Sequence, residues 1–229
     1  MSKTVRVVEN ILSANDRIAA RNRGLLDKSK VVAVNIMASP GAGKTSTILA
    51  TFERLKQDGI RLGIIEGDLA SSIDADKAIA QGIPAVQINT GCCCHLESHE
   101  MQEALDQMPL DEIDLLVVEN VGNLVCPTWW NLGEHLRVLI ASVPEGDDKP
   151  YKYPVMYKGV DAVIINKTDL LPYIDFNMDY FKEGVEILNP GLVTFPISAK
   201  TGEGMDAWVE WLKTAIAETH EAGTPASAD

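Results

Sequence analysis

The segment Val31-Val-Ala-Val-Asn-Ile-Met37 is followed directly by Ala38-Ser-Pro-Gly-Ala-Gly-Lys-Thr45. The apolar run predicts a buried strand, and the glycine-rich stretch predicts a loop that leads from this strand into a helix. In such a loop the glycines let backbone N–H groups approach phosphate oxygens, Lys44 brings a cation to the β- and γ-phosphates, and the Thr45 hydroxyl binds Mg²⁺. A glycine-rich turn without a ligand is the alternative, which the Gly-Lys-Thr ending disfavours. The residues expected to bind a nucleoside triphosphate are Gly41, Ala42, Gly43, Lys44, Thr45 and Ser46.

A second motif predicts which base is bound. The stretch Asn166-Lys-Thr-Asp169 follows another predicted strand, at residues 160–165, and therefore lies at the edge where open α/β sheets bind ligands. Guanine presents two neighbouring N–H donors, which one carboxylate accepts together, and adenine has no such pair. We therefore expect Asp169 to bind guanine, Lys167 to lie along the ring, and Asn166 to tie this loop to the phosphate loop. Ser198, Ala199 and Lys200, after a third strand, are expected to approach guanine O6. A solvated turn is the alternative interpretation.

The composition is that of a soluble globular chain with an acidic surface. The 229 residues are 46% hydrophobic, with a mean hydropathy of zero, which is enough for one sizeable core. Lys and Arg total 20 against 33 Asp and Glu, and the resulting net charge of -13 argues against nucleic acid or an anionic membrane as partner. No apolar run approaches the roughly 20 residues of a membrane span, and the N-terminus lacks a signal peptide. We therefore expect a cytoplasmic protein with reduced thiols.

Predicted strands and helices alternate along the chain. The strands are expected at residues 31–37, 61–66, 84–88, 114–119, 137–143, 160–165 and 192–197, and the helices at about 44–57, 74–81, 96–108, 176–188 and 204–219. This alternation predicts the α/β class, with a mostly parallel β-sheet covered by helices on both faces. Residues 1–29 are expected to form an N-terminal helical extension, residues 30–219 a single nucleotide-binding domain, and residues 220–229 a disordered tail. The charged stretch 144–150 is expected to be a loop.

Cysteine and histidine residues follow two of the predicted strands. Cys94 and His95 come after the third strand, and Cys126 comes after the fourth. Because the carboxyl ends of parallel strands meet at one edge, these residues should lie near the phosphate loop. Thiolate and imidazole suit Zn²⁺ and Ni²⁺, so the three side chains are the predicted ligands of one ion. Water, Cys92 or Cys93, or the same residues of a second subunit could complete the site. The alternative is that the cysteines are small core residues.

Two carboxylates are expected at the same edge. Asp68 follows the second strand, and Glu119 ends the fourth. Hydrolysis of a nucleoside triphosphate needs positioning and charge neutralisation, so Asp68 is the predicted second Mg²⁺ ligand beside Thr45, and Glu119 is predicted to support the metal or the attacking water. With Lys44 these form the predicted catalytic set. The alternatives are a helix N-cap for Asp68 and a salt bridge within a loop for Glu119. Neither a water-orienting glutamine nor an arginine finger is identifiable, so slow turnover is expected.

Five segments together strongly resemble the HypB family, the GTPases that incorporate nickel into hydrogenase. They are Ala38-Ser-Pro-Gly-Ala-Gly-Lys-Thr45, Glu66-Gly-Asp-Leu-Ala70, Cys94-His-Leu96, Glu119-Asn-Val-Gly-Asn-Leu-Val-Cys-Pro127 and Asn166-Lys-Thr-Asp169. The resemblance runs from about residue 30 to residue 215. It implies a SIMIBI-like G domain of the P-loop NTPase type that binds GTP or GDP with Mg²⁺ and hydrolyses GTP to GDP and phosphate.

The same resemblance implies a metal and several partners. Cys94, His95 and Cys126 match the family's G-domain site for Ni²⁺ or Zn²⁺. The expected partners are a second copy of the chain in a nucleotide-dependent homodimer, a HypA-type nickel metallochaperone, and the large subunit of [NiFe]-hydrogenase. Residues 1–30 contain no cysteine or histidine that could store nickel. The departures from the family pattern are Ala38, Cys92-Cys93 and Trp129-Trp130.

Two other functions are also considered from the motifs. The first is a related GTPase chaperone that serves urease or a cobalamin enzyme, against which the pairing of Cys-His-Leu with Asn-Leu-Val-Cys-Pro argues. The second is a metal-binding protein with a vestigial nucleotide site. The intact side chains of Lys44, Thr45 and Asp169 argue against it.

Overall fold

The computed structural model describes residues 11–68, 78–91 and 93–222, and its centre is a seven-stranded sheet in which every paired strand runs parallel to its neighbour. The strand order is β3-β2-β4-β1-β5-β6-β7. The strands are β1 Val32–Ala38, β2 Leu62–Asp68, β3 Ala85–Asn89, β4 Leu115–Glu119, β5 Leu136–Ser142, β6 Ala162–Asn166 and β7 Val193–Pro196. The prediction of an α/β fold with a parallel sheet is confirmed, and each strand end lies within two residues of its predicted position.

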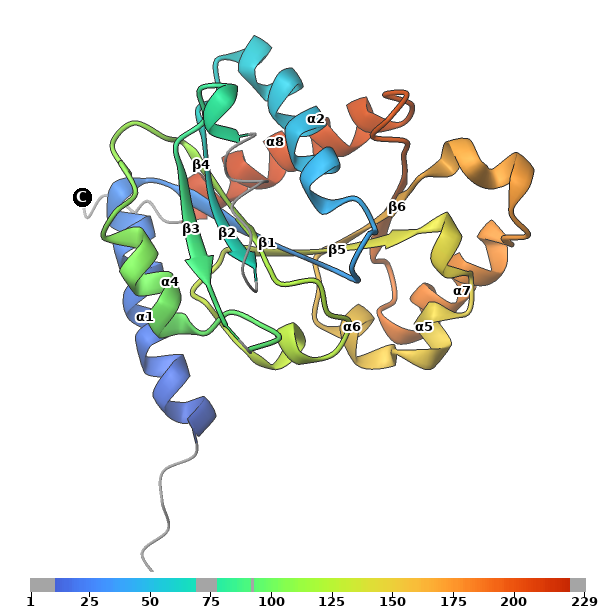
Figure 1. The fold of residues 1–229 in the computed structure, drawn as a ribbon, viewed down its shortest axis with the longest axis horizontal. Coiled ribbons are helices and arrows are strands. Elements are labelled where there is room, and N and C mark those ends of the chain that lie inside the picture. The colour runs from blue at the N-terminus through green and yellow to red at the C-terminus, as the bar shows by residue number, and fades with distance from the viewer. Residues whose placement is uncertain (1–10, 69–77, 92, 223–229) are drawn as a thin grey trace, which may run out of the picture.

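Helices cover both faces of this sheet (Figure 1). They are α1 Ile11–Ser29, α2 Lys44–Leu55, α4 Ser98–Leu105, α5 Lys149–Lys152, α6 Pro154–Lys158, α7 Met178–Leu188 and α8 Met205–Ala222, with 3₁₀ turns η1 Lys56–Asp58, η2 Cys126–Trp129, η3 Val143–Glu145 and η4 Thr168–Tyr173. Figure 1 shows α2 and α8 on one face, and α1, α4, α5, α6 and α7 on the other. None of the helices in the described segments is long and apolar enough to cross a membrane.

The core consists of side chains from the two faces of the sheet. Every residue of β1 is buried, as expected for a central strand with neighbours on both sides. On the first face, Ile36 belongs to one cluster with Phe52 of α2 and Trp208 of α8, and the Trp208 indole donates to Thr51 Oγ1 at 2.9 Å. On the second face, Leu26 of α1 packs with residues of α4, while α6 and α7 build a separate cluster. Helices therefore pack against both faces of the sheet whose carboxyl edge carries the loops.

Several predicted elements differ from the structure. The helix expected within residues 1–29 is found as α1 in the described residues, whereas the following expectations need correction. Residues 144–150 are not simply a loop, because η3 includes Glu145 and α5 begins at Lys149 with a proline in its first turn, a position that proline tolerates well. The helix α8 continues to Ala222, beyond the expected end of the domain at 219. Of the predicted helix 74–81, residues 78–80 are helical and residues 74–77 lie outside the described residues. The predicted tail at residues 223–229 and Cys92 also lie outside the described residues.

Candidate functional site

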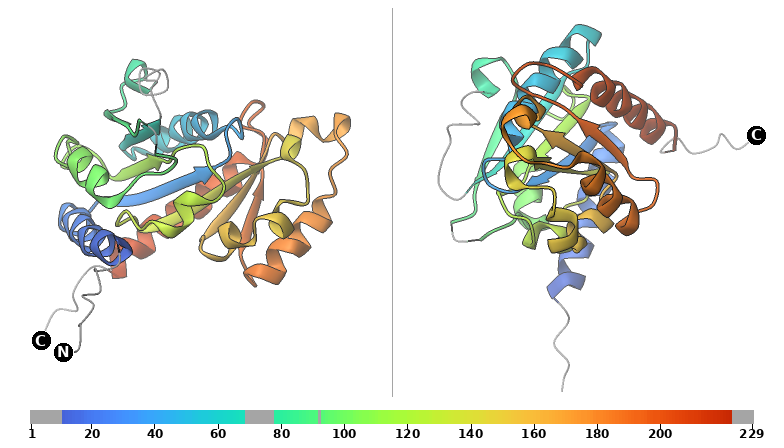
Figure 2. Two further views of the ribbon diagram at one scale, coloured as in Figure 1. Left: turned by 60° about the horizontal axis from the view of Figure 1, so that its bottom comes forward. Right: turned by 90° about the vertical axis from the view of Figure 1, so that its right-hand side faces the viewer.

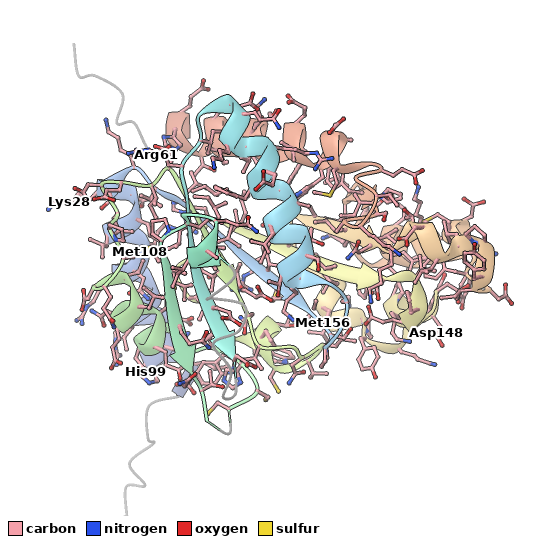
Figure 3. The ribbon with its side chains drawn as sticks, turned by 45° about the horizontal axis from the view of Figure 1, so that its top comes forward. Lys28, Arg61, His99, Met108, Asp148 and Met156 are labelled. Carbon is pink, nitrogen blue, oxygen red and sulfur yellow. The ribbon has the colours of Figure 1, made fainter. Side chains whose placement is uncertain are left out.

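The loops that carry the sequence motifs meet at the carboxyl edge of the sheet. The phosphate loop follows β1, and the loops with the cysteines and the guanine motif follow β3, β4 and β6. Because the strands are parallel, all these loops leave the sheet at the same edge. Figure 3 marks this edge by His99 near the start of α4, with Arg61 at the opposite edge, before β2. One continuous region therefore contains the predicted nucleotide and metal sites.

The phosphate loop joins the end of β1, at Ala38, to the start of α2, at Lys44. Gly43 has φ 98°, a left-handed conformation that glycine adopts without strain. A Cβ at this position would lie 2.4 Å from Asn166 Nδ2, so a larger residue would collide with the guanine loop. Asn166 Nδ2 also donates to the Ala42 carbonyl at 2.9 Å. The predicted tie between Asn166 and the phosphate loop is confirmed.

Asn166 connects three segments, because its Oδ1 also accepts from the Lys167 N–H at 2.8 Å and from the Ala199 N–H at 3.1 Å. The Ser198 hydroxyl donates to Asp169 Oδ1 at 2.8 Å, which fixes the carboxylate predicted to bind guanine. Lys167 has φ 64°, and its Nζ donates to the Gly41 carbonyl at 2.6 Å. The loops after β6 and β7 are thus joined to each other and to the phosphate loop. Lys200 follows as an exposed residue.

The predicted catalytic residues lie where β1, β2 and β4 end. Thr45 Oγ1 donates to Glu119 Oε1 at 2.9 Å, and Glu119 is only 6% exposed. Lys44 is half-buried at the start of α2, two residues before the exposed Ser46. Asp68 ends β2, and its backbone carbonyl accepts from the Thr90 N–H at 3.0 Å. The segment after Asp68 lies outside the described residues, so its interpretation as an N-cap or a Mg²⁺ ligand stays a prediction.

Glu145 is a buried acid at the nucleotide edge that the sequence analysis did not single out. It follows β5, the neighbour of β1, and its carboxylate accepts from the hydroxyls of Ser39 in the phosphate loop and of Ser142, the latter at 2.7 Å. Burial raises the pKa of Glu145. The signal available in the sequence was its place directly after a strand, which the acidic residues around it obscured.

The three predicted metal ligands lie together. One potential donor atom each from Cys94, His95 and Cys126 lies within 4.8 Å of the other two, and all three residues are half-buried. Contact with Cys126 raises the pKa of the Cys94 thiol, and burial raises it further. His95 Nδ1 lies 3.7 Å from Cys94 Sγ, while its Nε2 is buried without a hydrogen-bond partner. Two sulfurs and one nitrogen are a donor set that suits Zn²⁺ or Ni²⁺, and the ligand role itself stays a prediction.

The surroundings of His95 restrict its ring. Trp130 stacks on the imidazole with ring centroids 4.5 Å apart and planes inclined by 24°. Glu97 Oε1 lies 3.7 Å from His95 Nε2, and the Glu97 side chain also caps α4. Cys93, whose backbone N–H donates to the Thr90 carbonyl, is half-buried and is not a member of the donor cluster found in the described part of the chain. The Trp130 contact gives a role to a residue that sequence analysis noted only as a departure from the family.

The segment after β4 links the phosphate loop with Cys126, one of the predicted metal ligands. The Asn123 N–H donates to the Ala38 carbonyl at 2.9 Å, and Asn123 Oδ1 accepts from the Val125 N–H at 2.8 Å and the Cys126 N–H at 3.4 Å. A Cβ at Gly122 would lie 3.1 Å from the Pro40 backbone, so these two loops are in close contact. Cys126 is therefore held by one asparagine that is itself bonded to the phosphate loop.

The buried side-chain amide of Asn120 holds the other segment with predicted ligands, the one that carries Cys94 and His95. Asn120 Oδ1 accepts from the Leu96 N–H at 3.2 Å, and Asn120 Nδ2 donates to Asn35 Oδ1 at 3.2 Å. A Cβ at Gly67 would lie 2.7 Å from Leu96, so this side chain packs directly on β2. Asn120 is the residue after Glu119, which contacts the phosphate loop through Thr45. Both segments that carry predicted ligands are thus hydrogen-bonded to residues at the ends of β1 and β4, which lie at the nucleotide edge.

Comparison with known proteins agrees with this geometry. A family profile described as "CobW/HypB/UreG, nucleotide-binding domain" matches residues 32–195. A protein named hydrogenase maturation factor HypB from Rhizobium leguminosarum bv. viciae is 44% identical over 215 residues, which cover 94% of this chain and 72% of the relative. A crystal structure of HypB from Helicobacter pylori in complex with nickel superimposes with a TM-score of 0.86 at 37% identity, over 90% of this chain and 97% of that one. For HypB from Archaeoglobus fulgidus the TM-score is 0.83 at 37% identity, over 89% and 99%.

Proposed function

This chain belongs to the CobW/HypB/UreG family and, within it, to the HypB hydrogenase maturation factors, and from that premise we propose that it hydrolyses GTP to control the insertion of nickel into [NiFe]-hydrogenase. One observation carries the proposal. The segment from Glu119 to Cys126 contacts the phosphate loop at one end and contributes a metal-donor sulfur at the other. A change at the γ-phosphate can therefore reach a proposed nickel ligand through hydrogen bonds of the phosphate loop to one short segment of the chain.

The nucleotide is GTP or GDP. Asp169, fixed by Ser198, accepts the two guanine N–H donors, and ATP is rejected because adenine cannot supply them. The backbone N–H groups between Gly41 and Thr45 surround the phosphates, and Lys44 neutralises their charge. Ala199, whose N–H is bonded to Asn166 Oδ1, and the neighbouring Lys200 follow β7 and complete the base site.

Hydrolysis depends on the carboxylates at the ends of β2 and β4. Thr45 and Asp68 would hold Mg²⁺, and the oxygen donors gathered at Thr45 and Glu119 fit the preference of this ion. When bound, Mg²⁺ neutralises charge on the β- and γ-phosphate oxygens. Glu119 orients the Thr45 hydroxyl and presents a buried carboxylate near the attacking water.

Nickel is the cargo of this reaction, with zinc as the competing ion. Cys94, His95 and Cys126 bind it, and the three donors leave room for water or for donors from a second subunit. A homodimer whose stability depends on the nucleotide would then expose or cover the ion. The HypA-type metallochaperone and the large subunit of [NiFe]-hydrogenase are the proposed partners, and the cytoplasm is the proposed compartment.

A deletion strain tests this function. Cells that lack this protein should lose [NiFe]-hydrogenase activity and regain it in medium with excess nickel, while urease activity, assayed in parallel, should be unaffected. Loss of urease activity with intact hydrogenase would favour the related urease-type chaperone instead. Complementation with Lys44→Ala serves as the control, because this variant keeps the metal donors and should fail to restore hydrogenase at low nickel.

A further inference from the structure

The helix α1 lies outside the segment matched by the family profile, yet it packs beside α4 at the metal-bearing side of the sheet (Figure 1; Figure 2, left). Its sequence contains two deeply buried amides, since Asn15 is 6% exposed and Asn22 is 2% exposed. A buried amide destabilises a protein unless its hydrogen bonds are satisfied. The partners of these two side chains therefore indicate what the helix does.

Asn15 joins the two segments that carry the metal donors. Its Oδ1 accepts from the Ser98 N–H at 2.8 Å, and its backbone carbonyl accepts from the Ser98 hydroxyl at 2.8 Å. Its Nδ2 donates to the Asn131 carbonyl at 2.7 Å. Ser98 lies three residues after His95, and Asn131 directly follows Trp130, which stacks on that imidazole.

Asn22, two helical turns further on, repeats the same connection. Its Nδ2 donates to the Ser98 carbonyl at 2.8 Å and to the Leu132 carbonyl at 3.0 Å. One amide group thus holds the segment after His95 and the segment after Trp130 at a fixed separation. The partners in these hydrogen bonds are Ser98, Asn131 and Leu132, and not the predicted metal donors themselves.

The helix and the second segment are in direct contact. Gly133 has φ 95°, and a Cβ there would lie 2.5 Å from the Ala19 carbonyl oxygen. Arg23 Nε donates to the Gly133 carbonyl at 2.9 Å, and its guanidinium also donates to the Glu134 carbonyl. Residues 131–134 therefore follow the surface of α1 closely, so a shift of the helix would move them.

We propose that α1 is a clamp for the metal site and that Asn15 and Asn22 are positioning residues that keep His95 and its stacking partner Trp130 in place for nickel. The inference rests on the proposed function, because it assumes that Cys94, His95 and Cys126 bind the ion. Donors held in place before the ion arrives bind it more tightly, since less freedom is lost on binding. Supports outside the ligand set commonly change metal affinity by about 10- to 100-fold.

The test compares two buried asparagines of α1 with a half-buried asparagine in another part of the chain. Asn22→Ala removes two bonds to backbone carbonyls near the metal site. Asn189→Ala is the matched control, because Asn189 Nδ2 also donates to two backbone carbonyls, those of Tyr157 and Val160, both at 3.1 Å. Asn15→Ala is a second variant of the clamp, in case the more deeply buried Asn22 is needed for folding.

Each full-length variant is titrated with Ni²⁺ and with Co²⁺, whose thiolate absorption reports the geometry of the site, and GDP affinity and thermal stability are measured on the same samples. Asn15→Ala and Asn22→Ala should bind Ni²⁺ about 10-fold more weakly and alter the Co²⁺ spectrum, with GDP affinity unchanged. Asn189→Ala should lower thermal stability and leave both metal readouts as in the wild type.

Wild-type nickel affinity and Co²⁺ spectrum in both clamp variants would overturn the proposal. An equal loss of nickel affinity in Asn189→Ala would also overturn it, because general destabilisation would then explain the effect. The variant Cys94→Ala separates the two hypotheses. If it binds nickel as tightly as the wild type does, the proposed metal site and the proposed clamp are both wrong. If Cys94→Ala loses nickel binding while Asn15→Ala and Asn22→Ala bind nickel normally, only the clamp is wrong.

Discussion

The predicted nucleotide site (the nucleotide half) and the predicted metal site (the metal half) share one edge of one sheet, but they are supported in different ways. In the nucleotide half, motif residues hold each other: Asn166 bonds to Ala42 and Ala199, and Ser198 bonds to Asp169. In the metal half, the segments that carry Cys94, His95 and Cys126 are bonded to their own motif through Asn120 and Asn123, and the adjoining residues Ser98 and Leu132 are also bonded to Asn22 on α1, outside the motifs. Supports that belong to a motif are visible in the sequence, whereas supports from a distant helix are visible only in the structure.

This difference predicts two kinds of response to substitution. A change in the nucleotide half should remove a specific interaction with the ligand and leave the fold as it is. A change in the metal half should alter the geometry of the donors, or their connection to the nucleotide, even where the substituted residue touches no ligand.

The largest effect is expected for Lys44→Ala. Removing the cation from the β- and γ-phosphates should lower GTP turnover about 10³-fold, the range seen when a charge-stabilising group is deleted from an active site. The thermal midpoint should change little, because Lys44 is half-buried at a helix start and belongs to none of the core clusters. Single-turnover GTP hydrolysis and thermal unfolding check both statements, and unchanged turnover would mean that the active site lies elsewhere.

A smaller but more specific effect is expected for Asp169→Asn. Losing two charge-assisted hydrogen bonds should weaken GTP binding about 100-fold. The amide should instead pair with the carbonyl that xanthine carries in place of the guanine 2-amino group, so preference shifts toward xanthosine triphosphate. Ser198→Ala is the control, since it removes only the support of Asp169 and should weaken GTP binding without that shift. Equal affinity of the wild type for ATP and GTP would contradict the assignment of the base.

The sequence predicted the strands well because each is a short, mostly apolar segment between two polar loops. It also predicted the convergence of Cys94 and Cys126, since the carboxyl ends of parallel strands must meet at one edge. It could not predict that α1 reaches both metal-bearing segments, because Asn22 and Leu132 are 110 residues apart and no local pattern joins them. Glu145 was missed for a related reason: its contact to Ser39 exists only once β5 lies beside β1.

Coupling between the two halves gives the third prediction. The Asn123 backbone bonds to the phosphate loop and its side chain to the Cys126 N–H, so a nucleotide-dependent shift of one must move the other. Nickel affinity should differ about 5- to 150-fold between the forms bound to GDP and to a non-hydrolysable GTP analogue, corresponding to a coupling of roughly 1–3 kcal/mol. Nickel should change nucleotide affinity by the same factor. Titration of Ni²⁺ into both forms measures this difference.

Two kinds of control variant are used for this coupling: one removes a predicted metal ligand, and the other removes a hydrogen bond between the two sites. Cys94→Ala and Cys126→Ala should remove the difference and preserve GTP binding. Asn123→Ala keeps all three donors, so it should retain nickel binding but reduce the difference between the two nucleotide forms. Identical nickel affinities in both forms, with an unchanged oligomeric state, would mean that the two halves are merely neighbours.

The smallest effect is expected for Glu145→Gln, which tests whether the nucleotide half also has a support that motifs do not show. Burial raises the pKa of Glu145, so between its usual value and the raised one the folded protein holds a proton that the unfolded chain has released. The free energy of unfolding should therefore fall as pH rises through that interval. Glutamine cannot titrate and can still bond to Ser39 and Ser142, so the variant should show a flatter profile in urea unfolding from about pH 4 to 8. Glu183→Gln, at an exposed position on α7, is the control. If the free energy of unfolding of Glu145→Gln depends on pH as steeply as that of the wild type, this buried carboxylate does not set the pH dependence.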